Sequence, residues 1–187
     1  INAIVNGFSC KRFAADCAEK ILNCTDSEEI TLLDGDKTIT KEDSSHAVFG
    51  YTTHIYDGNF YTGFQSWRQA EEFKTYCFDD LKELPVGLNE KVCKVLNMDS
   101  FILTSGHERV WNFISDYLGV LYFAGVEMSA ETKFFITKKL QEAGKTVIAY
   151  GDGMNDYYML KQADVGYLIP KEYGTISRSL KGKDLGG

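Results

Sequence analysis

The apolar positions of the chain follow two different spacings, and the changes between them predict its elements. Residues 9–23 repeat apolar side chains at helical intervals behind Ser9, which predicts an amphipathic helix that begins at that serine. Residues 30–33 are a short, continuously apolar run that ends abruptly at Asp34, as expected for a buried strand. The stretch 47–65 is rich in Tyr, Phe and Thr around Asp57-Gly58, and this pattern is typical of a hairpin.

The second half of the chain alternates regularly between helical and strand patterns. Gly144 stands where a helix end needs a cap, and Pro85 stops an earlier helical pattern. Single helices between apolar strands indicate a parallel sheet covered on both faces, so the fold class is α/β with a Rossmann-like core. The predicted helices are 70–84, 88–96, 107–118, 129–143 and 155–162, and the predicted strands after the first are 101–104, 120–124, 146–150 and 165–169.

Composition narrows the classes of protein that fit this pattern. A net charge of −7 argues against nucleic acid as the main partner, because phosphate backbones select for clustered Lys and Arg. No apolar run approaches the roughly 18 residues of a membrane span. The five cysteines are an odd number without metal-ligand spacing, which suits a reducing cytoplasm. The chain opens on Ile1, which leaves open an upstream domain in a longer protein.

Carboxylates follow the predicted strands at the positions where ligands bind in such sheets. Asp34 and Asp36 come directly after residues 30–33, and Asp152 and Asp156 follow residues 146–150. Because parallel strands end at one edge of the sheet, these groups should meet there. Carboxylates this close repel one another unless a cation binds them, and Mg²⁺ is the expected ion.

Four motifs in this order resemble the haloacid dehalogenase superfamily, and most closely its phosphoserine phosphatase-like branch. They are Asp34-Gly35-Asp36-Lys37-Thr38, Ser105 after its strand, Lys133 early in a helix, and Gly151-Asp152-Gly153-Met154-Asn155-Asp156. The resemblance extends over roughly residues 30–170. Each motif alone is weak, because a D-G-D stretch after a strand is often only a turn.

The resemblance implies a Mg²⁺-dependent phosphomonoesterase that hydrolyses a small phosphorylated metabolite. Asp34 would attack phosphorus to form an aspartyl phosphate, and Asp36 would serve as acid and then as base. Lys133 would supply positive charge, in preference to Lys138 and Lys139 on the same helix. Metal ligands would be Asp34, Asp152 and the backbone carbonyl of Asp36, with Asp156 supporting Lys133 or a metal-bound water.

The remaining residues that the resemblance implies would contact the phosphate or the rest of the substrate. Thr38, Ser105 and Gly106 would bind phosphoryl oxygens, and Asn155 and His107 would touch substrate. Two simpler readings stay open. Ser105 could serve only as the N-cap of the helix that follows, and His107 could be a surface residue of that helix.

A second register of the first motif needs to be considered. Asp36-Lys37-Thr38-Ile39-Thr40 also resembles the phosphorylation motif D-K-T-G-T of P-type ATPases, in which Asp36 would be the nucleophile. We favour Asp34 because the apolar strand ends immediately before it and because Ile39 stands where that motif has glycine. The chain also lacks membrane spans and room for a nucleotide-binding domain.

The expected domain organisation is a core with an insertion. Residues 1–40 and 85–187 would form the core, with 1–28 as a helical extension, and 41–84 a small cap of a hairpin and a helix. The cap would select the substrate, which the sequence does not identify. The alternative to a free enzyme is a phosphatase-like domain that acts as a binding or regulatory module of a larger protein.

Overall fold

The computed structural model of the chain describes residues 2–50, 71, 73–74 and 81–170. They include a five-stranded sheet with the order β3-β2-β1-β4-β5, in which every neighbouring pair is parallel. The predicted α/β class is therefore confirmed. The strands are β1 (Glu29–Asp34), β2 (Ser100–Thr104), β3 (Leu121–Ala124), β4 (Thr146–Gly151) and β5 (Val165–Leu168).

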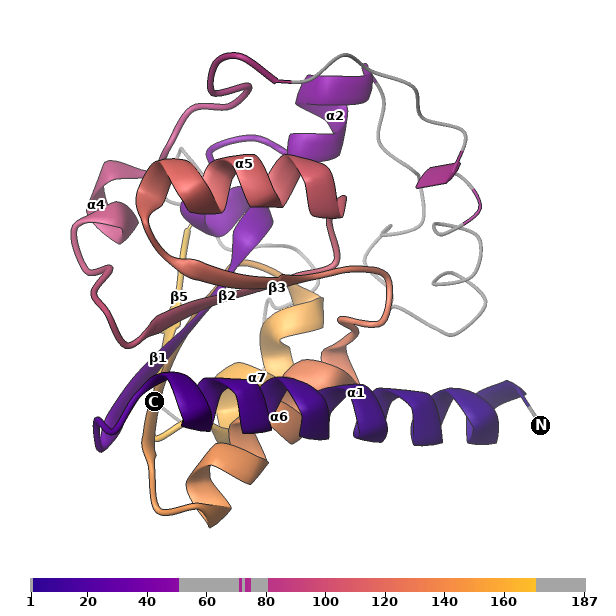
Figure 1. Cartoon of the computed structure of the whole chain (residues 1–187), viewed down its shortest axis with the longest axis vertical. Helices are drawn as coiled ribbons and strands as arrows, with labels where there is room; N and C mark the ends of the chain where they lie inside the picture. The colour runs from indigo at the N-terminus through magenta and orange to yellow at the C-terminus, as the bar shows by residue number, and fades with distance from the viewer. Residues whose placement is uncertain (1, 51–70, 72, 75–80, 171–187) are drawn as a thin grey trace.

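Helices cover both faces of the sheet (Figure 1). One layer consists of α1 (Asn2–Cys24), α6 (Ala130–Glu142) and α7 (Tyr157–Gln162), and α1 packs along α6. The other contains α5 (Glu108–Leu118) and the short α4 (Glu90–Cys93). The strands bury apolar side chains on both sides because each face packs on helices.

Alternate residues of the strands supply two separate cores. Leu32 and Phe101 pack with α1 and α6, whereas Leu33 and Ile102 pack against α5. The four side chains are fully buried. Full burial of such a side chain contributes about 1.5–3 kcal/mol. Both layers therefore hold β1 and β2 firmly in place.

The order of the strands fixes where the chemistry can occur. β1 is the central strand, with β2 on one side and β4 on the other. The chain passes from β1 outward through β2 to β3 and then returns across the sheet to β4 and β5. Ligands in open α/β sheets bind outside the carboxyl ends of the strands at such a change of direction. Asp34, the last residue of β1, stands at this point.

Several predicted helix boundaries need correction. The first helix does not begin at Ser9, because α1 already starts at Asn2. No proline lies in residues 2–24 to interrupt the helix. The helix predicted over 88–96 is reduced to α4, where the Asn89 side chain accepts a hydrogen bond from the Lys91 amide. The helix predicted over 155–162 begins with a 3₁₀ turn, η3 (Met154–Asp156), before α7.

The start of the predicted hairpin is also wrong. Residues 47–49 belong to a helix, α2 (Ser44–Phe49), rather than to a strand. The Asp43 side chain caps its first turn by accepting from the His46 amide, and Gly50 ends it with a left-handed φ of 82°. These two caps outweigh the β-propensity of the residues between them. The rest of the predicted hairpin and most of the following helix lie outside the described residues.

The end of the helix predicted over 70–84 is also wrong, because residues 81–84 are not helical. The strands and the other helices predicted among the described residues agree with the structure to within a few residues. Over the described residues, the helices contain no segment that is both long and apolar enough to cross a membrane.

Candidate active site

Asp34 is the centre of a buried cluster of charged groups. Its Oδ1 accepts from the Lys133 ammonium at 2.7 Å, and its Oδ2 accepts from the Thr38 hydroxyl at 3.2 Å. Thr38 is fully buried in η1 (Gly35–Ile39), the irregular turn that follows β1 and contains two residues with non-helical φ/ψ. The turn brings the threonine back beneath the carboxylate four residues earlier, so both oxygens of Asp34 have donors.

Lys133 joins two of the predicted motifs. It lies in the first turn of α6, and its ammonium donates to Asp156 Oδ1 at 2.8 Å as well as to Asp34. Only 2% of the residue is exposed, whereas Lys138 and Lys139 on the same helix are exposed. Burial alone would lower the pKa of Lys133, but the carboxylates of Asp156 and Asp34 outweigh burial and raise it. Lys133 is therefore charged at neutral pH.

Asp156 is held by the backbone of its own loop. Its Oδ2 accepts from the amides of Asp152 at 3.1 Å and Gly153 at 3.3 Å. Close packing requires glycine at position 151, because a Cβ there would lie 2.4 Å from the Cβ of Asp156. Burial and the charge of Asp34 raise the pKa of Asp156 to about 6, against the opposing effect of Lys133.

The carboxylates of Asp34, Asp152 and Asp156 form a set that fits a hard cation. One oxygen from each lies within 4.8 Å of the other two. Burial, followed by the charge of Asp34, raises the pKa of Asp152 well above its ordinary value. Ionised carboxylates this close repel one another, and a divalent ion such as Mg²⁺ would stabilise them in the ionised state. The donor set therefore fits the predicted metal.

The carboxylate of Asp36 points elsewhere. It accepts from the backbone amide of Ser44, the first residue of α2, at 2.7 Å. Burial raises the pKa of Asp36 to about 7, and the nearby charge of Asp43 adds to the effect. The predicted contact between the Asp36 carbonyl and a metal stays a prediction.

The loop after β2 carries three of the predicted phosphate and substrate residues. Ser105 is half-buried, and the buried Gly106 donates its amide to the Thr104 hydroxyl at 3.1 Å. The N-cap of α5 is His107, whose Nδ1 accepts from the Arg109 amide at 3.2 Å. The capping role considered for Ser105 is therefore wrong.

Two other predicted contacts are less direct. The His107 ring packs against Phe49 of α2 and against Phe73, with ring centroids 5.5 and 5.0 Å apart, so it lies where the core meets the inserted segment. Asn155 is half-buried in η3 between the two loop carboxylates. Contacts of either residue with substrate remain predictions.

Sequence reasoning missed two residues at this site. Ser44 supplies the amide that holds Asp36, and Trp111 of α5 lies fully buried against Gly35 and Gly106. Ser44 follows no motif, so only the path of the chain identifies it. Trp111 carries a weak signal, because a large aromatic residue in the helix after the second motif must pack close to that motif.

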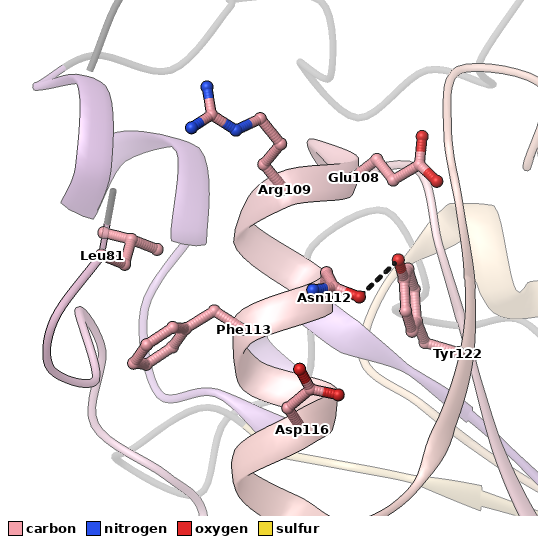
Figure 2. A pocket seen from close by; sticks show the side chains of 7 residues that line it. All are labelled: Leu81, Glu108, Arg109, Asn112, Phe113, Asp116 and Tyr122. Carbon is pink, nitrogen blue, oxygen red and sulfur yellow. Dashed lines mark hydrogen bonds between the residues drawn. The ribbon is translucent and has the colours of Figure 1, made fainter. Parts of the chain in front are cut away.

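A pocket of about 390 Å³ lies outside this cluster, on the outer side of α5 (Figure 2). None of its lining residues was predicted to belong to the site. A hydrogen bond from the Tyr122 hydroxyl to Asn112 crosses part of it at 3.2 Å. The lining residues are Leu81, Glu108, Arg109, Asn112, Phe113, Asp116 and Tyr122. Mixed charges without a convergent donor set give this pocket no chemistry comparable to that of the carboxylate cluster.

Comparisons with known proteins find similarity both in sequence and in structure. No family model matches the chain. Over 86 residues, 45% of this chain, it is 30% identical to the potassium-transporting ATPase ATP-binding subunit of Halobacterium salinarum (strain ATCC 29341 / DSM 671 / R1). The matched region spans only 12% of that relative.

Two solved structures of the catalytic CPx-ATPase domain CopB-B are similar to the chain. One, determined in a study of nucleotide binding, covers 82% of this chain and 84% of its own at 18% identity, with a TM-score of 0.43. The other covers 82% and 81% at 19% identity, with a TM-score of 0.44. Scores this low do not by themselves establish a relationship.

These comparisons change the expectations drawn from the sequence. None of these similar proteins is a phosphoserine phosphatase, so that branch is not confirmed.

Proposed function

We propose that this chain is a haloacid dehalogenase-like phosphoryl-transfer domain in which Asp34 becomes phosphorylated and water then releases the phosphate. The observation that carries the proposal is the buried contact of 2.7 Å between the Lys133 ammonium and Asp34 Oδ1, beside the carboxylate of Asp152. The Asp34 carboxylate lies beside the Lys133 ammonium and beside carboxylates that could bind a metal ion. Positive charge on both sides would stabilise a phosphoryl group on Asp34.

The first step forms a bond between an Asp34 oxygen and phosphorus while the bond to the leaving oxygen breaks. Asp36 gives its proton to that oxygen, which a carboxyl with a pKa of about 7 can do near neutral pH. Lys133 neutralises charge that builds up on the phosphoryl oxygens. Asp34 and Asp152 would hold Mg²⁺, whose charge would orient the phosphate and screen it from the attacking carboxylate.

The second step returns Asp34 to its starting state. Water attacks phosphorus, Asp36 accepts its proton, and the bond between phosphorus and Asp34 breaks. Asp156 keeps Lys133 in position throughout, since it accepts from that ammonium at 2.8 Å and is itself fixed by two backbone amides. Thr38 holds the other oxygen of Asp34.

The register with Asp34 as nucleophile has more support than the register with Asp36. Asp34 faces Lys133 and Asp152, whereas Asp36 accepts from Ser44 at the start of α2. The match to part of an ATPase subunit does not distinguish the two registers. Both motifs lie within residues 34–40.

The setting we propose is a domain of a longer ATPase-like protein, with ATP as phosphoryl donor. The 30% identity to an ATP-binding subunit over 86 residues supports it. Residues 41–84 would be the insertion that approaches the donor, and the cytoplasm would be the compartment. The second candidate is a free phosphomonoesterase, which the four intact motifs favour but the comparisons do not.

The test is formation of an acyl phosphate. We would incubate the chain with Mg²⁺ and either ATP labelled at the γ-phosphate or an aryl phosphate, and then measure hydroxylamine-sensitive label and phosphate release. Asp34→Asn should abolish both signals, and Asp36→Asn should slow them. Asp26→Asn changes an exposed carboxylate and serves as the matched control.

The outcomes separate the candidates. Signal from ATP but not from the aryl ester supports the ATPase setting, and the reverse supports the phosphomonoesterase. If both signals persist in Asp34→Asn and are lost in Asp36→Asn, then Asp36 is the nucleophile. No signal with either donor would refute the phosphoryl-transfer proposal.

A further inference from the structure

Trp111 connects the two turns that follow the proposed nucleophile and the proposed phosphate-binding serine. A Cβ placed on Gly35 would lie 2.5 Å from Cζ2 and 2.6 Å from Cη2 of the indole. A Cβ placed on Gly106 would lie 2.3 Å from Nε1 and 2.7 Å from Cδ1 of the same ring. The two edges of one side chain therefore touch the backbone of both turns.

The contacts explain why glycine occupies both positions. Neither Gly35 nor Gly106 has a φ in the left-handed region, so the backbone itself would accept alanine. What excludes a side chain is the ring. Gly35 directly follows Asp34, and Gly106 directly follows Ser105, so the indole limits how far these two site residues can move relative to each other.

The indole N–H indicates that Trp111 does more than fill space. Trp111 is fully buried, and among the described residues its Nε1 has no hydrogen-bond partner. An unpaired buried donor is unfavourable, and a purely apolar side chain would avoid that cost. A phenyl ring, however, is too short to reach Gly35 while it also contacts Gly106. The reach of the bicyclic ring is what this position requires.

We propose that Trp111 is a positioning residue that sets the separation between the Asp34 turn and the Ser105 turn. This inference rests on the proposed function, because it concerns the alignment of a nucleophile with the phosphoryl group. Small misplacements of reacting groups reduce rate strongly, by about 10²-fold for an error near 1 Å. Loss of alignment lowers kcat, whereas ground-state binding of substrate changes little.

The experiment is a double-mutant cycle in the whole chain with Mg²⁺ and the better of the two phosphoryl donors. Trp111→Phe should lower kcat by about 10- to 100-fold with KM changed by less than about threefold. Gly106→Ala should also lower kcat, because its methyl group displaces the turn from the indole. The double variant should lose much less than the product of the single losses, because the smaller ring makes room for the methyl group.

Ile114→Val is the control for stability. Ile114 is fully buried one turn further along α5 in the same core, and it is not among the nearest contacts of either glycine. Unfolding by urea should show that the control also loses stability, while its kcat stays at the wild-type value.

If the wild-type chain is active, three outcomes would overturn the inference. These are an unchanged kcat in Trp111→Phe, losses that multiply in the double variant, or an equal loss of kcat in Ile114→Val. A wild-type chain inactive with both donors would instead refute the proposed function, and this inference with it.

Discussion

The Nζ atom of Lys133 lies 2.7 Å from Oδ1 of Asp34, and 3% of the lysine side chain is exposed. The same ammonium lies 2.8 Å from Oδ1 of Asp156, whose side chain is 2% exposed. One cation thus serves two carboxylates within the protein. Removal of one partner of a buried ion pair is costly, because the other charges stay behind without compensation.

Lys133→Met should therefore affect both stability and chemistry. The free energy of unfolding should fall by about 3–5 kcal/mol. Phosphoryl transfer should slow by roughly 10²- to 10³-fold, as when a preorganised donor is removed. Urea unfolding and acyl-phosphate formation measure the two effects. The control Lys138→Met changes an exposed lysine on the same helix and should change neither. An unaltered rate in Lys133→Met would contradict the assigned role.

Asp152→Asn should weaken the stabilisation of the chain by Mg²⁺. With a chelator at neutral pH, the variant should be more stable than wild type, because burial and then the charge of Asp34 penalise an ionised Asp152. With Mg²⁺ in excess, wild type should gain about 2.7 kcal/mol at 100 times the dissociation constant, and the variant much less. Thermal unfolding with and without the ion measures both effects.

Asp164 offers a contrasting control for that experiment. Its Oδ2 accepts from the Val147 amide at 2.8 Å and from Gln141 at 3.0 Å, and these bonds lower its pKa. Asp164→Asn should therefore lower stability by the same amount with and without Mg²⁺. Equal Mg²⁺ stabilisation of wild type and Asp152→Asn would show that Asp152 is not a ligand.

The sequence predicted the central strand and its terminal carboxylate because both depend on local patterns. An uninterrupted apolar run must be buried, and β1 ends at Asp34 as that run predicts. Lys133 was distinguished from Lys138 and Lys139 by its place near the start of the helix, which the structure places beside Asp34. Hydrophobic periodicity and the order of the motifs are therefore enough to locate this strand end and the start of this helix.

The direction of the Asp36 side chain could not be predicted in the same way. It depends on η1, in which Lys37 takes a left-handed φ of 60° and turns the chain back toward α2. Lysine at position 37 does not indicate a left-handed φ, which is more common for glycine or asparagine. Similarly, α2 exists because of the caps at Asp43 and Gly50, whereas propensity over residues 47–49 favoured a strand. A left-handed residue decided the first case and two helix caps the second, and neither follows from hydrophobic periodicity or strand propensity.

Asp43→Asn should shift the pH dependence of phosphoryl transfer to lower pH. The pKa of Asp36 is raised to about 7 by burial and then by the charge of Asp43, so the rate that needs protonated Asp36 should fall as pH rises through about 7. Asparagine caps α2 as well as aspartate does but carries no charge. The pKa of Asp36 should therefore fall. The pH profile of acyl-phosphate formation measures the shift.

The same group makes stability depend on pH with a defined sign. Between its ordinary pKa of 3.8 and about 7, Asp36 keeps a proton in the folded chain that the unfolded chain has released. The free energy of unfolding of wild type should therefore fall relative to Asp36→Asn as pH rises through this range. Asp26→Asn should leave both profiles unchanged. A shift to higher pH in Asp43→Asn would contradict the coupling.

His107→Asn should remove an acid-sensitive contribution to stability. In the folded chain, Nδ1 of His107 accepts a hydrogen bond from the Arg109 amide and so caps α5. Burial, followed by the charge of Arg109, lowers the pKa of His107 from its ordinary value of 6.5. As pH falls, His107 therefore becomes protonated at a higher pH in the unfolded chain than in the folded chain. As pH falls below 6.5, the free energy of unfolding of wild type should decline.

The expected size of this decline is that of a lost N-cap, about 1 kcal/mol. A protonated ring at the start of a helix also meets the positive end of the helix dipole. Asparagine caps without titrating in this range, so urea unfolding of His107→Asn should vary less with pH than that of wild type. His46→Asn changes an exposed histidine of α2 and should follow wild type. If wild type and His107→Asn lose stability in parallel below pH 6.5, the cap of α5 does not depend on the neutral ring.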